Sequence, residues 1–391
     1  MKAVVPGVGG AGWRWQAHEF IGGVAPQDRI KGDVEVFRHT LSFDSYAPLI
    51  RCPVLHRSGT NDFHCWMDGV YRTNALIPNQ PLRYCWSPHL NHRLIPEVEV
   101  AMPLWFDQFL KGGPVLPETP RSELVLQTED HIPNLHVTAK HAWPVARCEI
   151  FYSVDPDPRA RFWRSADVVR AGDTFTAKLP LHALDLPLFA FANVYHTLPE
   201  PVSLKLLPGH SAPVRELCLS SLLHSVTPKQ LSEAKAATMA KANPLIDDFA
   251  RGLRDWYQLN AGNFAHQQTW TRKLTDPLCR GGDGAKLKLT LRMPKTNRLA
   301  FVVIQNEWRS DRGPKRTFVC EREIPGADSE QSVVLALSDF AATAPENGPL
   351  KSWSQIDQFG ICAHFAERGA TATQVPAWIG PAPPFTRLEW M

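Results

Sequence analysis

The alternation of apolar strands with helices in the first part of the chain constrains its fold most. Two short apolar runs, residues 52–56 and 82–86, favour buried strands, and residues 67–76 between them favour a helix. Residues 96–110 then carry apolar side chains at helical spacing, and the glycines that follow end that helix. A strand, helix, strand, helix order predicts a mostly parallel sheet covered by helices.

Beyond residue 115 the pattern changes to short strands separated by turns rich in Asp, Pro and Gly. Residues 115–225 predict a small antiparallel, Ig-like β-sandwich. Residues 230–241 are rich in Ala and Lys and predict a linker helix, and the strand-rich remainder predicts a second sandwich of jelly-roll type. The predicted fold class is therefore α/β followed by two all-β sandwich domains. The predicted segments are 1–113, 115–225, 226–243 and 244–391.

Polar residues follow each of the two predicted parallel strands. Asp62 lies in the loop after residues 52–56, and His92 lies in the loop after residues 82–86. Parallel neighbours end at the same sheet edge, where ligands bind in open α/β sheets, so Asp62 and His92 are expected side by side. A carboxylate there accepts the imidazole Nδ1–H and stabilises the imidazolium that forms when the ring takes a proton. His89 in the same loop is the alternative histidine, and helix capping is the alternative role of Asp62.

Asp62, His92 and the helix that ends in WFDQFLKG together resemble the C-terminal part of an α/β-hydrolase domain. In that fold the acid follows the seventh strand and the histidine the eighth, so residues 1–113 would supply strands six to eight. The segment is similar to the branch of dienelactone hydrolases, acetylxylan esterases and prolyl-peptidase-like enzymes.

This resemblance implies a serine-type hydrolase of carboxylic esters, with an acylated or uronate-esterified glycan as substrate. Asp62 would orient His92, which would serve as the general base and then as the general acid. A prolyl-oligopeptidase-like peptidase is an alternative. The parent enzyme is expected to be periplasmic or secreted.

The nucleophile of that family is missing from the sequence. No G-x-S-x-G motif occurs, nor a Cys or Asp equivalent at such an elbow. Residues 2–6 resemble the sixth strand, so the resemblance implies that the elbow and the first five strands would precede Met1. The chain is therefore predicted to be inactive alone. A polypeptide that supplies the N-terminal half of the hydrolase domain is an expected partner.

Tryptophans gather in the last segment, which resembles galactose-binding-like sandwiches attached to secreted glycan-acting enzymes. Trp256 and Trp353 stand beside polar residues and are predicted to be exposed, where they could stack on sugar rings. A non-catalytic glycan-binding or scaffold protein acting through this sandwich is therefore the alternative function. Filling of the core is the other interpretation of these tryptophans. No cofactor is expected, although Asp247 and Asp248 could offer oxygen ligands to Ca²⁺.

Charge and hydropathy narrow the classes of partner. The formal net charge is +3 and the basic residues are scattered, which argues against nucleic acid. No run approaches the roughly 18 apolar residues that a membrane-spanning helix needs, so no membrane span is expected. The eight cysteines are widely spaced without zinc-site patterns and are interpreted mostly as buried thiols.

Overall fold

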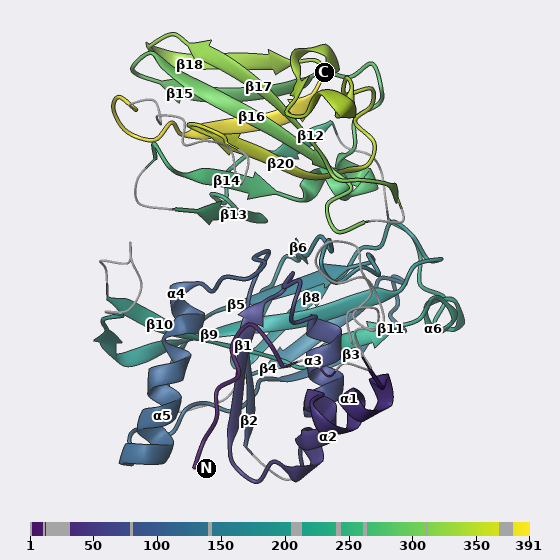
Figure 1. Ribbon diagram of the computed structural model, residues 1–391, viewed down its shortest axis with the longest axis vertical. Helices are drawn as coiled ribbons and strands as arrows, with labels where there is room; N and C mark the ends of the chain where they lie inside the picture. The colour runs from purple at the N-terminus through teal and green to yellow at the C-terminus, as the bar shows by residue number, and fades with distance from the viewer. Residues whose placement is uncertain are drawn as a thin grey trace. The chain divides into compact units, whose positions relative to one another are not determined.

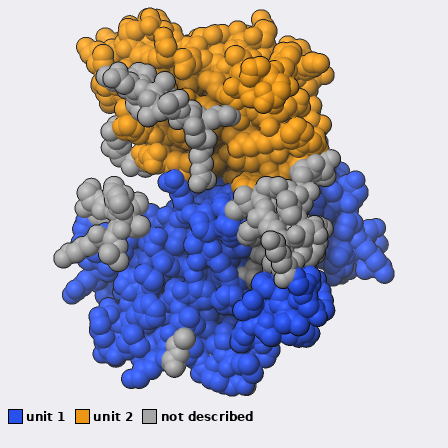
Figure 2. Space-filling view, in the orientation of Figure 1, with its two compact units in different colours: residues 1–239 blue, residues 240–391 orange. Residues whose placement is uncertain are grey.

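The computed structural model divides into two compact units, residues 1–239 and 240–391 (Figure 1, Figure 2). Antiparallel sheets predominate in both units. The boundary between the units lies inside the segment 226–243 that the sequence predicts as a linker. The structure describes residues 2–10, 12, 32–78, 81–139, 143–204, 213–239, 244–260, 264–309, 312–366 and 378–391.

The first part of unit 1 contains a parallel strand pair and its helices. Strands β1 and β2 run in parallel register from Val54↔Leu82 to Gly59↔Ser87. On the other side of β1, Val4 and Gly7 form isolated parallel bridges. The predicted strand, helix, strand, helix order is therefore present. The elements are α1 (Val34–Thr40), α2 (Phe43–Tyr46), η3 (Ala47–Leu49), β1 (Val54–Gly59), α3 (Met67–Asn74), β2 (Leu82–Ser87), α4 (Pro96–Glu99) and α5 (Ala101–Lys111).

The predicted helix over residues 96–110 is divided into α4 and α5. Pro103 has no backbone N–H to donate to the carbonyl of Glu99, so one bond of a continuous helix cannot form there. The helix ends at Gly112, which takes the left-handed conformation with φ of 70° that favours glycine. Buried Val98 and Trp105 pack this helical segment onto the core.

The second part of unit 1 is a β-sandwich of two antiparallel sheets, as the sequence predicts. One sheet has the order β3-β4-β8-β7, and the other has the order β10-β9-β5-β6 with β11 paired to β9. Between them lies an apolar core that includes Leu135, Ile150 and Phe175. The strands are β3 (Arg121–Val125), β4 (Asn134–Thr138), β5 (Val145–Ser153), β6 (Arg164–Ser165), β7 (Val169–Ala171), β8 (Thr174–Lys178), β9 (Leu188–Val202), β10 (Val214–Ser220) and β11 (His224–Val226).

Strand β9 explains why the two parts of unit 1 form one body. Its residues 188–196 are all buried, so both faces of the strand are covered. Leu188 and Ala190 face the sandwich core, whereas Phe189 and Phe191 belong to the apolar cluster that contains Trp86 of β2. The predicted domains 1–113 and 115–225 therefore share an apolar interface.

The predicted helix over residues 230–241 is shorter than expected. Only α6 (Pro228–Glu233) is helical, and Thr227 caps it in a capping box with Gln230. The chain then turns back along the sandwich, where the N–H of Met239 donates to the carbonyl of Leu181 at 2.8 Å. This backbone pairing takes the place of a continued helix. Residues 240–243 lie outside the described residues.

Unit 2 is also a β-sandwich. Its sheets have the orders β12-β21-β15-β18 and β13-β14-β20-β16-β17-β19. One apolar cluster that includes Leu289, Phe301 and Phe359 fills the space between them. The elements are β12 (Leu245–Asp247), β13 (Trp256–Leu259), β14 (Gln268–Thr271), η4 (Lys273–Thr275), η5 (Pro277–Cys279), β15 (Leu287–Met293), β16 (Asn297–Gln305), β17 (Arg316–Ile324), β18 (Ala327–Leu335), η7 (Leu337–Asp339), β19 (Ala341–Ala342), η8 (Pro345–Asn347), β20 (Ile356–Cys362) and β21 (Phe385–Trp390). Across the described parts of the chain, no helix is long and apolar enough to cross a membrane.

Candidate functional site

Asp62 lies in the turn that follows β1, and four groups contact its carboxylate. Oδ1 accepts the backbone N–H groups of His64 at 2.7 Å and Cys65 at 2.9 Å. Oδ2 accepts the hydroxyl of Ser58 at 3.1 Å and lies 2.9 Å from Nδ1 of His92. A buried carboxylate is expensive unless such donors satisfy it. These local donors thus hold the carboxylate in one orientation.

The structure brings His92 and Asp62 together, as their places after parallel strands suggest. None of the Asp62 side chain is exposed, whereas 40% of the His92 side chain is. An ionised Asp62 accepts the proton of Nδ1, which leaves Nε2 as the ring nitrogen able to accept another proton. The ring of His92 stacks on Phe63, with 5.3 Å between the ring centroids. The pair therefore combines a buried carboxylate with an accessible imidazole.

Backbone packing between the two loops fixes this geometry. Residues 88–95, here called the histidine loop, pass directly over Gly59. A Cβ added at Gly59 would lie 2.0 Å from the carbonyl oxygen of Asn91, so only glycine allows this close approach. The N–H of Asn61 donates to the carbonyl of Leu90 at 3.0 Å. The side-chain oxygen of Asn91 accepts the N–H of Phe63 at 3.2 Å. The two loops are thus bonded to one another on both sides of Asp62.

His89 does not contact Asp62, and the alternative assignment of this histidine is not the one the structure shows. Its backbone has a positive φ of 62° and its N–H donates to Thr60 Oγ1 at 2.9 Å. The turn directs the buried His89 ring toward Phe151 and Phe162, whose ring centroids lie 5.8 and 6.4 Å away. His89 is part of the contact with the sandwich.

Sequence reasoning missed two further histidines, His64 beside this pair and His56 in β1. The ring of His64 meets the edge of His92, with 5.1 Å between centroids. Burial lowers the pKa of His64, and the neighbouring His92 lowers it further. His56 is fully buried in β1, which lowers its pKa to about 3 and keeps it neutral. Nε2 of His56 lies 3.4 Å from the sulfur of Cys65. The position of His64 two residues after Asp62 is the one sequence signal for it, and no sequence signal marks His56.

Trp256 and Trp353 are buried, so the prediction that they are exposed is wrong. Their exposed fractions are 6% and 1%. The indole of Trp256 donates to Asp247 Oδ2, and that of Trp353 to the carbonyl of Ala285, both at 2.8 Å. Polar neighbours misled the prediction because Ser352 and Ser354 are only half-buried while Trp353 between them faces the core. Neither indole offers a face to a sugar ring.

The acids proposed for Ca²⁺ are engaged with protein groups. Asp247 pairs with Lys273 and with the indole of Trp256. Asp248 accepts the backbone N–H of Ala250 in a turn. Within the described ranges, no group of three or more His, Cys, Asp or Glu residues could hold a metal ion. Of the eight cysteines, all within the described ranges, only Cys148 is not buried.

Comparison with known proteins gives no family. No protein-family model matches this chain, and no curated protein matches it. One similar solved structure is described as the structural basis for the promiscuous specificity of carbohydrate-binding modules from the β-sandwich superfamily. It is 10% identical, covers 71% of this chain and 100% of its own, and has a TM-score of 0.19. A score that low carries no argument about fold or function.

Proposed function

We propose that Asp62 and His92 are the acid and the base of a serine-type hydrolase that cleaves carboxylic esters. The observation that carries this proposal is the 2.9 Å contact between Nδ1 of His92 and Oδ2 of Asp62. The exposed fractions of 0% and 40% match the two roles, because the acid is shielded and the base is reachable. Two residues with only a structural role in these loops would not need one buried and one exposed side chain.

The chemistry follows from the proton positions. Nε2 of His92 accepts the proton of the attacking serine hydroxyl as its oxygen bonds to the ester carbonyl carbon. The imidazolium then gives that proton to the departing alkoxide. Asp62 stabilises the imidazolium and holds the ring in the required tautomer. The N–H groups of His64 and Cys65 keep the carboxylate in place throughout.

We further propose that residues 1–113 correspond to strands six to eight of an α/β-hydrolase sheet. The parallel bridges of Val4 and Gly7 to β1, followed by the parallel pairing of β1 with β2, support this order. The serine would then belong to a polypeptide segment that carries the first five strands and the nucleophile elbow. No G-x-S-x-G motif occurs in the 391 residues.

Acylated or uronate-esterified glycans are the proposed substrates, because the first part of the chain resembles acetylxylan esterases. The buried Trp256 and Trp353 remove the main support for the alternative of a glycan-binding scaffold. No contact of the described residues favours a peptide bond over an ester.

The test reads the genomic sequence upstream of Met1 and, where it continues in frame, expresses the longer chain. Hydrolysis of p-nitrophenyl acetate and of acetylated xylan is then measured. Asp62→Asn is expected to lower kcat by about 10⁴-fold, because the ring is held in the wrong tautomer. Glu97→Gln, at a half-buried position in α4 outside the two loops, is the control. Unchanged kcat in both Asp62→Asn and His92→Ala would overturn the proposal.

A further inference from the structure

Residues 155–161, here called the brace loop, belong to the sandwich of unit 1 but hold the residue next to Asp62. The amide nitrogen of Asn61 donates to the carbonyl of Arg161 at 2.7 Å and to the carbonyl of Arg159 at 3.3 Å. Asn61 is fully buried. Its two donated bonds therefore end on the backbone of the brace loop.

The same amide group links the brace loop to the histidine loop. Oδ1 of Asn61 accepts the hydroxyl of Thr60 at 2.9 Å, and Thr60 Oγ1 accepts the N–H of His89 at 2.9 Å. The backbone N–H of Asn61 donates to Leu90. One continuous path of hydrogen bonds thus joins the histidine loop, residues 60–66 (here called the acid loop) and the sandwich.

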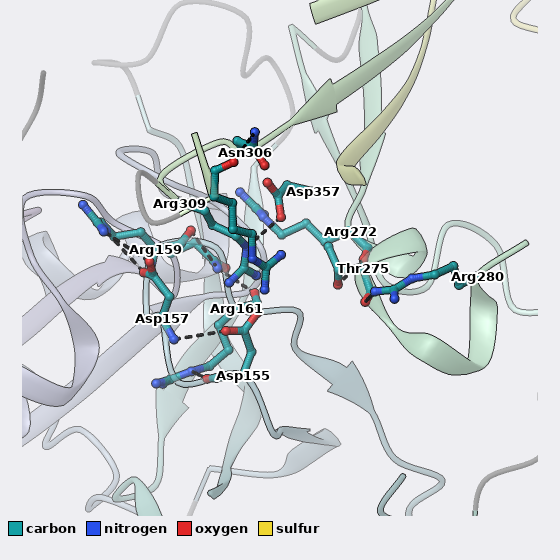
Figure 3. A network of polar contacts seen from close by, with 12 residues as sticks. Asp155, Asp157, Arg159, Arg161, Arg272, Thr275, Arg280, Asn306, Arg309 and Asp357 are labelled. Carbon is teal, nitrogen blue, oxygen red and sulfur yellow. Dashed lines mark hydrogen bonds and ion pairs between the residues drawn. The ribbon is translucent and has the colours of Figure 1, made fainter. Parts of the chain in front are cut away.

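Arg161 fixes the brace loop from within (Figure 3). Its Nε donates to the carbonyl of Asp155 at 2.8 Å, which closes the loop on itself. Its two terminal nitrogens lie 3.0 and 3.3 Å from the carboxylate oxygens of Asp68. The guanidinium also lies 3.7 Å from the ring centroid of Phe189.

The contact with Asp68 closes the arrangement, because Asp68 is in the first turn of α3, directly after the acid loop. The Arg161 side chain is wholly buried, and removing one partner of such an ion pair strongly destabilises the protein, because the other charge loses its partner. The brace loop therefore holds the acid loop at Asn61 and α3 at Asp68. Asp62 lies between these two attachments.

We infer that Asn61 and Arg161 are positioning residues, through which the sandwich sets the distance between Asp62 and His92. The inference rests on the proposed function. Groups that act in catalysis must be held to within about 0.5 Å by neighbours whose own side chains are locked. The sandwich is thus part of the machinery of the site, although neither positioning residue touches the reacting atoms.

The test compares two buried asparagines that bridge the same two parts of unit 1. Asn193 donates to the carbonyl of Trp86 at 2.9 Å and accepts the hydroxyl of Ser220 at 2.6 Å, away from the acid loop. Asn61→Ala and Asn193→Ala are made in the full 391-residue chain, labelled with ¹⁵N-histidine. The readout is the low-field proton resonance of Nδ1–H of His92 and its exchange rate with water.

Asn61→Ala is expected to abolish this resonance or to speed its exchange several-fold, while Asn193→Ala leaves both unchanged at a similar loss of Tm. Retention of the resonance with wild-type exchange in Asn61→Ala would overturn the inference, and so would equal loss in both variants. If circular dichroism shows Asn61→Ala unfolded, Asp68→Asn replaces it, with faster exchange expected and unchanged exchange contradicting the inference. A wild-type chain without the resonance would instead contradict the proposed function.

Discussion

The sequence predicts functional residues in two regions, the loops of Asp62 and His92 in unit 1 and the tryptophans of unit 2. The structure places the two sets in different environments. The two loop residues meet at 2.9 Å, and 40% of the His92 side chain is exposed. Only 1% of the surface of Trp353 is exposed, and this residue belongs to the main core cluster of unit 2.

The difference teaches which kind of sequence signal places a side chain. Asp62 and His92 were located by the ends of two parallel strands, and that argument concerns backbone direction. The tryptophans were located by residue type and polar neighbours, and neither of these fixes the direction of a side chain in a sandwich. A large aromatic residue in such a fold gains more from burial than a polar neighbour can offset.

The largest expected effect tests the tryptophan side of this comparison. Trp353→Ala should lower the free energy of unfolding of unit 2 by about 3–5 kcal/mol, because it leaves a large cavity beside Phe340 and Trp390. Denaturant unfolding followed by circular dichroism measures this loss. Trp378→Ala, at a half-buried position, is the control and should lose less. Suppose instead that Trp353→Ala lowers the free energy of unfolding by less than about 1 kcal/mol, and that xylan oligomers saturably quench the tryptophan fluorescence of the wild type. Trp353 would then be an exposed, sugar-binding residue, contrary to the structure.

The next largest effect tests the burial of His56 in unit 1, which lowers the pKa of this residue to about 3 in the folded state. The unfolded chain takes up the proton more readily, so this contribution to stability is complete above pH 6.5 and is lost as pH falls toward 3. Between pH 7.5 and pH 5 the stability difference between wild type and His56→Gln should narrow by about 2 kcal/mol.

Urea unfolding at the two pH values measures this change. His39→Gln, on the exposed side of α1, is the matched control and should keep the wild-type dependence. A difference between wild type and His56→Gln that does not vary with pH would show that His56 is not buried as the structure has it.

The smallest expected effect is an absence of turnover. The isolated chain should hydrolyse p-nitrophenyl acetate no faster than His92→Ala does, because no serine of the 391 residues stands in a G-x-S-x-G motif. A spectrophotometric assay at equal concentrations checks this. A saturable rate that Asp62→Ala abolishes would reveal a nucleophile in the chain, and the proposed division of the site would be wrong.

The sequence predicted the elements of the first part well because apolar periodicity reports burial on one face or both. It failed at the helix over residues 230–241, where pairing of Met239 with Leu181 overrides the helix propensity of Ala and Lys. It could not foresee that both faces of β9 are covered, which joins the first two predicted domains. It also missed Asn61 and Arg161, because their partners lie far away in the chain and no local pattern connects them.

We propose that this chain carries a preformed pair of acid and base, and the Nδ1–H proton of His92 tests this most directly. In the ¹⁵N-histidine-labelled chain at neutral pH, we expect a low-field imidazole resonance that His92→Gln removes. Asp62→Asn should remove it as well, because the buried carboxylate that accepts this proton at 2.9 Å is gone. A folded wild-type chain without that resonance, or one whose resonance persists in Asp62→Asn, would contradict the account.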